Sequence, residues 1–326
     1  MTDWLSQTLE PPDLPAALHA LILQVPQGAV TTCGTLAGAL GDHRAALWIA
    51  RQLTDEVWRT GIPWQRVVLK DGRLPTTTAA HHEIQCRLLR SEGVPIGVGG
   101  IVSTSGWFTD FKSDAPLQQL QEQQRLLQGN VVLQGRAENW RTVAGLDIAY
   151  PRPGWARAAY VEVALEDGRV LWEETCTGET QFPYITGYLA YREIPCYLRL
   201  LRNIISHRPL ADVLMLDGSG WMHPRQFGIA CHLGVLLQHP TLGVSKKCLH
   251  GRADKSNSTG EFYPLLGKSG DVLGYGRESR AGRNPVYVSP GHLCSVEQAR
   301  DLARQCWQDN RLPQPTYLAD RLSRRE

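Results

Sequence analysis

Residues 143–150 read VAGLDIAY, a stretch that places one acid, Asp147, inside an otherwise apolar run. A second acid, Asp217, ends the apolar run 213–216 and precedes Gly218. Short apolar runs of this kind are typical of buried strands. A carboxylate in a buried strand is costly unless it is paired or binds a cation. Each acid, taken alone, can instead cap the turn that follows it.

The residues around these two acids predict a mixed α/β sheet. Strand-like runs at 143–148, 158–165 and 170–175 are separated by Gly and Pro. A helix over 188–205, a strand at 213–216, a helix near 224–238 and a strand at 242–245 are expected next. Strands that first form a meander and then alternate with helices indicate a mixed sheet. Ligands of such folds bind at the carboxyl ends of strands, where both acids are expected.

Glu193, on the helix predicted over 188–205, joins Asp147 and Asp217 as a candidate metal ligand. Oxygen ligands without clustered Cys or His favour Mg²⁺ or Mn²⁺ over zinc. Carboxylates that hold such ions are suited to phosphodiester hydrolysis. Lys246 follows the strand at 242–245 and either neutralises a phosphate or is a solvated lysine beside Lys247.

The first region of the chain is predicted to be mostly helical. Apolar residues at helical spacing mark one face between Leu14 and Val25. A short helix follows, capped by Thr31 or Thr32 and ended by Gly41, and a second helix is expected over about 43–57. Two short helices around a glycine turn are typical of a helix-turn-helix, although all-helical cores contain similar corners.

Length and composition favour two globular domains. The chain has 326 residues, of which 42% are hydrophobic and 20% charged, and these values exclude a disordered chain. No apolar run approaches 18 residues, so we expect no transmembrane helix and no membrane partner. The acidic segment 1–12 lacks the basic start of a signal peptide, and we expect a cytoplasmic protein. Glycine, serine and aromatic residues crowd the seam at 97–118.

Charge and cysteine content limit the partners and the chemistry. Residues 1–110 carry 8 basic and 10 acidic residues, whereas 111–326 carry 26 and 22. Any electrostatic contact with phosphates should therefore lie mostly in the second part. The eight cysteines include no Cys-x-x-Cys pair, which excludes a zinc knuckle and a secreted disulfide framework.

Residues 117–322 resemble endonuclease V, the deoxyinosine-directed repair nuclease. The resemblance rests on ordered motifs spread over about 200 residues. They read VAGLD (143–147), FPYITGYLAYRE (182–193), DGSG (217–220), HPR (223–225), GIACHLG (228–234), PTLGVSK (240–246), SPGH (289–292) and LPQPT (312–316).

This resemblance implies a ribonuclease H-like fold and a Mg²⁺-dependent endonuclease that cuts the second phosphodiester bond 3′ to deoxyinosine. Asp147 and Asp217 would be metal ligands, Glu193 and Asp320 would complete the acidic cluster, and Lys246 would face the scissile phosphate. Mn²⁺ would substitute for Mg²⁺.

The resemblance also assigns contacts with the damaged base. Tyr184 would fill the gap left by the flipped base. The residues assigned to DNA or lesion binding in this part are Pro183, Tyr184, Ile185, Gly187, Leu189, Gly218 and His223. Thr186 stands where the family usually has a second Pro, and Ser219 replaces a bulkier polar residue. His292 either supports the site or only packs in a turn.

Residues 14–97 resemble the DNA-binding domain of O6-alkylguanine-DNA alkyltransferases and of the alkyltransferase-like proteins. The motifs are PQGAVTTCG (26–34), IPWQRVV (62–68) and LLRSEGV (88–94). Alkyltransferases read Pro-Cys-His-Arg-Val at the second motif, and Trp64 and Gln65 occupy its Cys and His positions here. Because Trp carries no nucleophile, we expect no alkyl transfer. Three roles stay open for this domain: recognition of O6-alkylguanine, other contacts with DNA, and a structural or partner role without DNA.

Two further positions depart from that pattern. Cys33 stands where the family usually has a base-flipping Tyr, and Leu47 stands where it has an Arg finger. Leu47 could instead wedge between bases, as apolar side chains sometimes do. Together with Trp64 and Arg66, these residues are the predicted lesion contacts of the first domain.

The sequence therefore predicts a two-domain DNA-repair protein. Residues 1–100 form an alkyltransferase-like, winged-helix-like domain, 101–116 a linker, and 117–326 the nuclease. Fusion would couple damage recognition to nicking through effective concentration. Two alternatives remain: an inosine-directed ribonuclease that uses the same site, and a damage-binding protein without catalysis. The sequence does not predict an oligomeric state.

Overall fold

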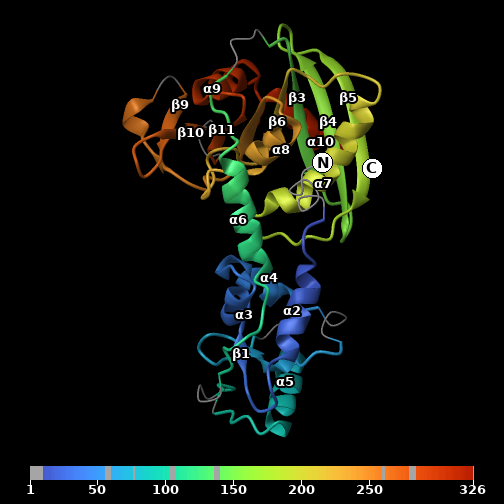
Figure 1. The fold of residues 1–326 in the computed structure, drawn as a ribbon, viewed down its shortest axis with the longest axis vertical. Coiled ribbons are helices and arrows are strands. Elements are labelled where there is room, and N and C mark those ends of the chain that lie inside the picture. The colour runs from blue at the N-terminus through green and yellow to red at the C-terminus, as the bar shows by residue number, and fades with distance from the viewer. Residues whose placement is uncertain are drawn as a thin grey trace. The chain divides into compact units, whose positions relative to one another are not determined.

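The structure is a computed structural model that describes residues 10–55, 60–75, 78–97, 99–102, 107–135, 140–258, 261–278 and 284–325. These residues form two compact units (Figure 1). The N-terminal unit comprises Pro12–Glu122 and Phe182–Thr186, and the C-terminal unit comprises the other described residues. The chain passes from one unit to the other within helix α6 (Pro116–Gln128). No described helix is long and apolar enough to cross a membrane.

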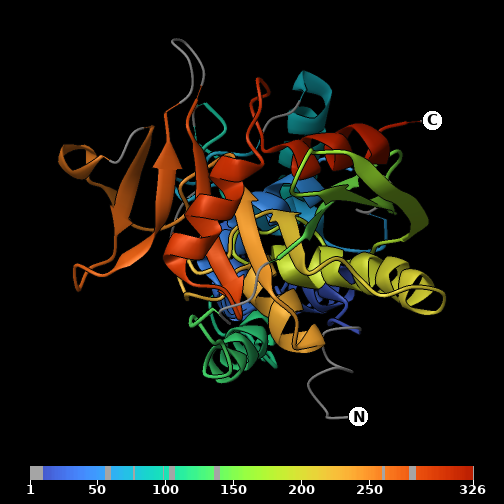
Figure 2. The same cartoon turned by 90° about the horizontal axis from the view of Figure 1, so that it is seen from above.

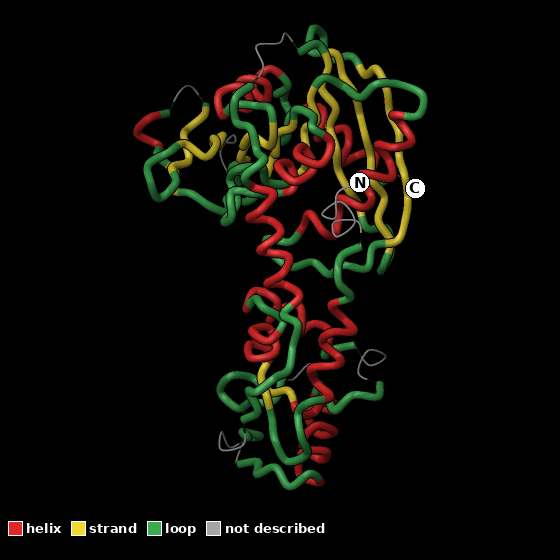
Figure 3. Tube along the Cα trace, in the orientation of Figure 1, coloured by secondary structure: helices red, strands yellow, loops and turns green. Residues whose placement is uncertain are grey.

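The N-terminal unit is mainly helical, as the red segments of Figure 3 show. Its core contains Leu14, Leu18, Leu21, Ile22 and Val25, the apolar face that the sequence predicts. The helices are α2 (Leu14–Leu23), α3 (Cys33–Ala39), α4 (Ala46–Gln52) and α5 (Ala79–Ser91), with the 3₁₀ turns η1 (His43–Ala45) and η2 (Trp64–Arg66) and the short strands β1 (Thr31–Thr32) and β2 (Val67–Val68).

The predicted pair of short helices corresponds to α3 and α4. Thr32 caps α3 by accepting a hydrogen bond from the Thr35 amide at 3.0 Å. Gly41 ends this segment with φ +98°, and a Cβ there would lie 2.5 Å from the Gln118 backbone nitrogen. Helix α4 ends at Gln52 rather than near 57, because a turn follows in which the Thr54 hydroxyl donates to the Arg51 carbonyl. Residues 56 and 57 of the predicted helix lie outside the described residues.

The two N-terminal motifs lie side by side. Strands β1 and β2 pair in parallel, with Thr31 opposite Val67 and Thr32 opposite Val68. From α5, the Gln85 side-chain amide donates to the Gln65 and Val67 carbonyls, both at 3.0 Å. The segment that contains Trp64 is therefore held from two sides.

The C-terminal unit contains a nine-stranded mixed sheet, as predicted, in the order β5-β4-β3-β6-β7-β11-β10-β9-β8. Strands β3, β4 and β5 form an antiparallel meander, and β6 and β7 run parallel to β3. The strands are β3 (Thr142–Ala149), β4 (Trp155–Ala164), β5 (Val170–Glu179), β6 (Val213–Asp217), β7 (Thr241–Ser245), β8 (Arg252–Ala253), β9 (Phe262–Leu266), β10 (Val272–Arg277) and β11 (Val286–His292).

Helices cover both faces of this sheet (Figure 2). On one face, α7 (Leu189–Ile205) and α8 (Ile229–Leu237) pack on a core that includes Leu146 and Leu216. On the other face, α9 (Val296–Gln305) and α10 (Gln314–Ser323) pack on a core that includes Val143 and Met215. Successive strand residues thus alternate between the two cores.

One sequence-based expectation for this unit needs correction, and four strands had no counterpart in the sequence analysis. Helix α8 begins at Ile229 rather than near 224, because Gln226 adopts φ +48° and Gly228 forms the N-cap. The four strands β8 to β11 were not predicted. Their runs are short, and Pro264, Gly274 and Gly276 interrupt the alternation of apolar and polar residues.

Candidate active site

The sheet register places Asp147 beside Asp217. Strands β3 and β6 are parallel neighbours, and Leu146 lies opposite Leu216. Asp147 follows Leu146 in β3, and Asp217 follows Leu216 as the last residue of β6. Both follow residues that face α7, so both lie toward the face covered by α10.

Helix α10 brings a third acid to the same place. It can approach β3 because residue 145 is glycine: a Cβ there would lie 2.0 Å from the Pro315 carbonyl oxygen. The Ser323 hydroxyl donates to Asp147 Oδ2 at 2.7 Å. One carboxylate oxygen from each of Asp147, Asp217 and Asp320 lies within 4.8 Å of the others. These three residues are called the aspartate cluster below.

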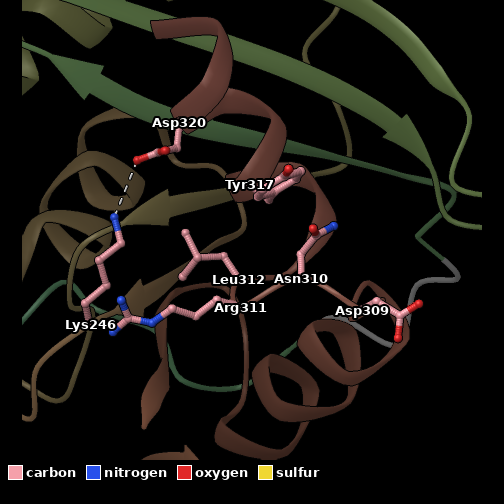
Figure 4. Close-up of a pocket in the computed structure, with 7 residues that line it drawn as sticks. All are labelled: Lys246, Asp309, Asn310, Arg311, Leu312, Tyr317 and Asp320. Carbon is pink, nitrogen blue, oxygen red and sulfur yellow. Dashed lines mark ion pairs between the residues drawn. The ribbon is translucent and has the colours of Figure 1, made fainter. Parts of the chain in front are cut away.

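Lys246 contacts the aspartate cluster. Its Nζ lies 2.6 Å from Asp217 Oδ2 and 3.6 Å from Asp320 Oδ1, and the second contact is drawn in Figure 4. Partial burial alone would lower the pKa of Lys246, but the carboxylates of Asp217, Asp320 and Asp147 raise it. The lysine is thus a charged partner of the cluster rather than a solvated residue.

Glu193 lies beside the aspartate cluster, although it is not one of the three acids whose oxygens are within 4.8 Å. Its side chain comes from α7 and is 7% exposed. Glu193 Oε1 accepts a hydrogen bond from the Tyr150 hydroxyl at 2.8 Å. The Arg192 guanidinium lies 4.3 Å from the Tyr150 ring centre. Burial, together with the charges of Asp217 and Asp147, raises the pKa of Glu193 to about 8.

The electrostatics of the cluster fit a divalent cation. Burial and the charge of Asp217 raise the pKa of Asp147 to about 7. Crowded carboxylates of this kind are the oxygen ligands that Mg²⁺ and Mn²⁺ prefer. The aspartate cluster could therefore hold a metal ion, with Lys246 as the neighbouring cation.

Stability without metal should decrease as the pH rises. Folded Asp147 keeps its proton up to about pH 7, whereas an aspartate of the unfolded chain has a pKa of about 3.9. The stabilisation of the fold that comes from the raised pKa of Asp147 is complete below about pH 4. It is lost as the pH rises through about 7. We expect the melting temperature in EDTA to fall by about 5 °C or more between pH 5 and 8. Calorimetry should show a flatter dependence for Asp147→Asn, and an unchanged slope would contradict the expectation.

Sequence reasoning missed two side chains that contact the acids. Tyr150 is at the end of the 143–150 stretch, but its hydroxyl reaches an acid on another element. Ser323 lies one turn after Asp320 on α10, so helical spacing could have placed both on the face toward β3. Neither residue type signals such a role by itself.

Three of the residues assigned to lesion binding, Gly187, Leu189 and Gly218, lie between β6, α7 and α8. The Gly187 carbonyl accepts hydrogen bonds from Arg225 Nη2 at 2.5 Å and from the Gln124 side-chain amide at 3.3 Å. A Cβ at Gly218 would lie 2.4 Å from Ile229 Cγ2, so the missing side chain allows α8 to approach. Leu189 is the first residue of α7 and packs partly against the core.

The predicted wedge and two histidines differ in exposure. Tyr184 is 57% exposed, whereas Ile185 next to it is buried, as Pro183 is. His223 is buried, and its Nδ1 accepts from the Arg225 amide at 3.3 Å. His292 is also buried, and its Nδ1 accepts from the Val132 amide at 3.2 Å, a contact that fits the packing interpretation.

An open pocket of about 530 Å³ adjoins the aspartate cluster. Figure 4 shows Lys246 and Arg311 extending toward it, with Asp320 above. The other lining residues are Asp309, Asn310, Leu312 and Tyr317. Two cationic side chains next to the acids suit a polyanionic ligand.

In the N-terminal unit, the alkyltransferase-type motif forms an internal network. Gln65 Nε2 donates to Glu92 Oε1 at 2.5 Å, and Arg66 Nε donates to Glu92 Oε2 at 2.8 Å. Arg66 Nη1 also donates to the Val25 carbonyl at 2.7 Å. Burial would raise the pKa of Glu92, but its hydrogen bonds with Arg66 and Gln65 lower it. The guanidinium of Arg66, a predicted lesion contact, is thus held within its own unit.

The other predicted lesion contacts of this unit differ in access. Burial raises the pKa of the Cys33 thiol to about 11, so this cysteine is a poor nucleophile. Leu47 on α4 is 63% exposed. Nearby, Arg44 lies 2.8 Å from Asp42 in an ion pair. Trp64 is the first residue of η2, and its indole side chain carries no thiol that could accept an alkyl group.

Comparison with known proteins relates both parts of the chain to families. The family model Endonuclease V matches residues 125–321, and that of the 6-O-methylguanine DNA methyltransferase DNA-binding domain matches residues 14–94. A bifunctional methyltransferase/endonuclease of Picrophilus torridus is 33% identical over 299 residues, which are 91% of this chain and 92% of that protein.

Solved structures match the C-terminal part. Human endonuclease V is 33% identical with a TM-score of 0.58, covering 64% of this chain and 96% of the human chain. Endonuclease V of Ciona intestinalis, solved with DNA that contains an inosine followed by a ribo-adenosine, is 25% identical with a TM-score of 0.60. That match covers 65% of this chain and 97% of the other. The chain therefore belongs to the endonuclease V family and joins its nuclease domain to a DNA-binding domain of the 6-O-methylguanine DNA methyltransferase type.

Proposed function

We propose that the chain hydrolyses the second phosphodiester bond 3′ to deoxyinosine in DNA, with Mg²⁺ held by Asp147, Asp217 and Asp320. The observation that carries this proposal is the aspartate cluster with Lys246 at 2.6 Å from Asp217. Relatives named endonuclease V, and the inosine-containing DNA bound by the Ciona intestinalis protein, support the substrate. We place Glu193 beside the cluster as its fourth acid.

The roles of the side chains follow from their contacts. Ser323 orients the Asp147 carboxylate, and Tyr150 orients that of Glu193. Lys246 provides a positive charge for the scissile phosphate and stabilises charge that develops there. Bound Mg²⁺ would activate the attacking water and stabilise the leaving oxygen. Tyr184 is sufficiently exposed to occupy the gap left by a flipped base.

We further propose that residues 1–100 bind altered DNA without transferring an alkyl group, and that α3 and α4 serve as a helix-turn-helix. Trp64 offers no nucleophile, and Gln65 uses its amide to bind Glu92. Cys33 is a poor substitute because its thiol keeps its proton. We assign the ribonuclease H-like nuclease to residues 117–326 and treat 101–116 as the segment that leads into it, although the described residues of that segment belong to the compact N-terminal unit.

Nicking of a duplex with one deoxyinosine tests the nuclease proposal. We expect a single nick at the second bond 3′ to the lesion with Mg²⁺ or Mn²⁺, and no nick with EDTA. The same duplex with deoxyadenosine in place of the lesion is the control. A matched inosine-containing RNA strand measures the competing ribonuclease function. Faster cleavage of RNA than of DNA would favour that alternative, and no cleavage of either would favour a damage-binding protein.

A further inference from the structure

Tyr197 has a buried hydroxyl whose hydrogen bonding is not accounted for by the described part of the fold. It lies on α7, has no exposed surface and belongs to the core beneath β3 and β6. Its hydroxyl has no hydrogen-bond partner among the described residues. A buried hydroxyl without a partner is costly, so such groups are rare and call for an explanation.

The position of Tyr197 relates it to the acidic site. It follows Glu193 by four residues, so both side chains lie on the same face of α7. Side chains on a helix lean toward its N-terminus, which directs the Tyr197 ring back toward the level of Glu193. Burial raises the pKa of this hydroxyl well above the ordinary value, and the charges of Glu193, Asp147 and Asp217 raise it further.

A second buried tyrosine on the same core shows the usual arrangement. The Tyr160 hydroxyl donates to Glu162 Oε2 at 3.0 Å and accepts from the Ala211 amide at 2.9 Å. Its side chain is fully buried like that of Tyr197. The core therefore satisfies the hydroxyl of Tyr160, whereas the hydroxyl of Tyr197, one helical turn from Glu193, has no partner among the described residues.

We propose that Tyr197 is a positioning residue whose hydroxyl forms its hydrogen bond with hydration water that a divalent cation brings into the acidic site. This inference rests on the metal site of the proposed function. Mg²⁺ gives up its water reluctantly and keeps several water molecules in protein sites. An ion held by three aspartates has coordination positions left for such water. Residues that form hydrogen bonds with the ligands of a metal strongly affect its affinity. Tyr197 would thereby link the loaded site to α7 and to Glu193.

Tyr197→Phe tests this proposal in the full-length protein with two measurements that do not depend on nicking. In EDTA, calorimetry should give a melting temperature equal to or higher than that of wild type, because an unsatisfied hydroxyl has been removed. In a titration with Mn²⁺ followed by electron paramagnetic resonance, the Kd should increase by about 10-fold.

Tyr160→Phe is the matched control. It removes a partnered hydroxyl from the same core, so the melting temperature should fall in EDTA while the Kd for Mn²⁺ stays unchanged. A lower melting temperature of Tyr197→Phe in EDTA with an unchanged Kd would overturn the proposal and assign the hydroxyl to the metal-free fold. An unchanged Kd alone would also overturn it, while the metal site stands. Failure of wild type to bind Mn²⁺ would overturn both this role and the proposed metal site.

Discussion

Replacing Asp217 with asparagine is expected to lower the rate of Mg²⁺-dependent nicking at deoxyinosine by at least about 10³-fold. The carboxylate belongs to the aspartate cluster and contacts Lys246 at 2.6 Å. An amide of the same size keeps the packing but removes one negative charge from the cluster. It also leaves Lys246 without its shortest ion pair. Single-turnover nicking of a duplex with one deoxyinosine measures the effect.

The folding of this variant separates chemistry from stability. Because like charges crowd the cluster, removing one should leave the melting temperature in EDTA unchanged or higher. Asp167→Asn is the matched control, since that carboxylate is 57% exposed and lies 3.7 Å from Arg169. It should nick at the wild-type rate. An Asp217→Asn protein that is folded and nicks within about tenfold of wild type would contradict the assignment.

The core of the site could be predicted from the sequence because it breaks a pattern. Asp147 interrupts an apolar strand and Asp217 ends another, and parallel pairing of these strands is enough to bring them together. Lys246 follows the next strand, so the same sheet edge places it nearby. These three positions need only local patterns and the usual topology of an α/β sheet.

Other parts of the site depend on contacts that no local pattern contains. Asp320 reaches the cluster because α10 packs against Gly145, about 170 residues away in sequence. Its assignment from sequence rested on the family resemblance. Tyr197 looks like an ordinary core residue, because an aromatic residue on the buried face of a helix usually is one. What distinguishes it is that its hydroxyl has no hydrogen-bond partner in the part of the chain that the structure describes.

The N-terminal motif also contains contacts that its local sequence pattern does not reveal. Arg66 was predicted to contact the lesion because it belongs to the segment 62–68, which resembles an alkyltransferase motif. In the structure its guanidinium binds Glu92 and the Val25 carbonyl, 26 and 41 residues away in sequence. Its contact with lesion DNA stays a prediction, and the internal network is the function that the geometry supports. Leu47, a predicted lesion contact on α4, is 63% exposed and could meet DNA without breaking such a network.

Leu47→Glu is expected to weaken binding of a duplex with one O6-methylguanine by about 10- to 100-fold, or ~1.4 to ~2.8 kcal/mol. Leu47 is 63% exposed on α4, so the substitution should not affect folding. The change removes an apolar side chain that can insert between bases. It also adds a negative charge to a unit that already carries more acidic than basic residues, and this charge would repel the phosphates. Fluorescence anisotropy in EDTA, where no nicking occurs, measures the Kd at a fixed salt concentration.

Leu23→Glu provides the matched control, because it adds the same charge at a leucine of the same unit that is 59% exposed on α2. It should bind the damaged duplex within about threefold of wild type, since a distant surface charge is largely screened. Equal losses for both variants would mean that the added charge acts only through the net charge of the unit. Equal affinity of Leu47→Glu and wild type would exclude α4 as the DNA-contacting helix. Leu47→Arg offers the reverse change: a cation on the same exposed position should strengthen binding if α4 faces the phosphates, and should leave the Kd unchanged if it does not.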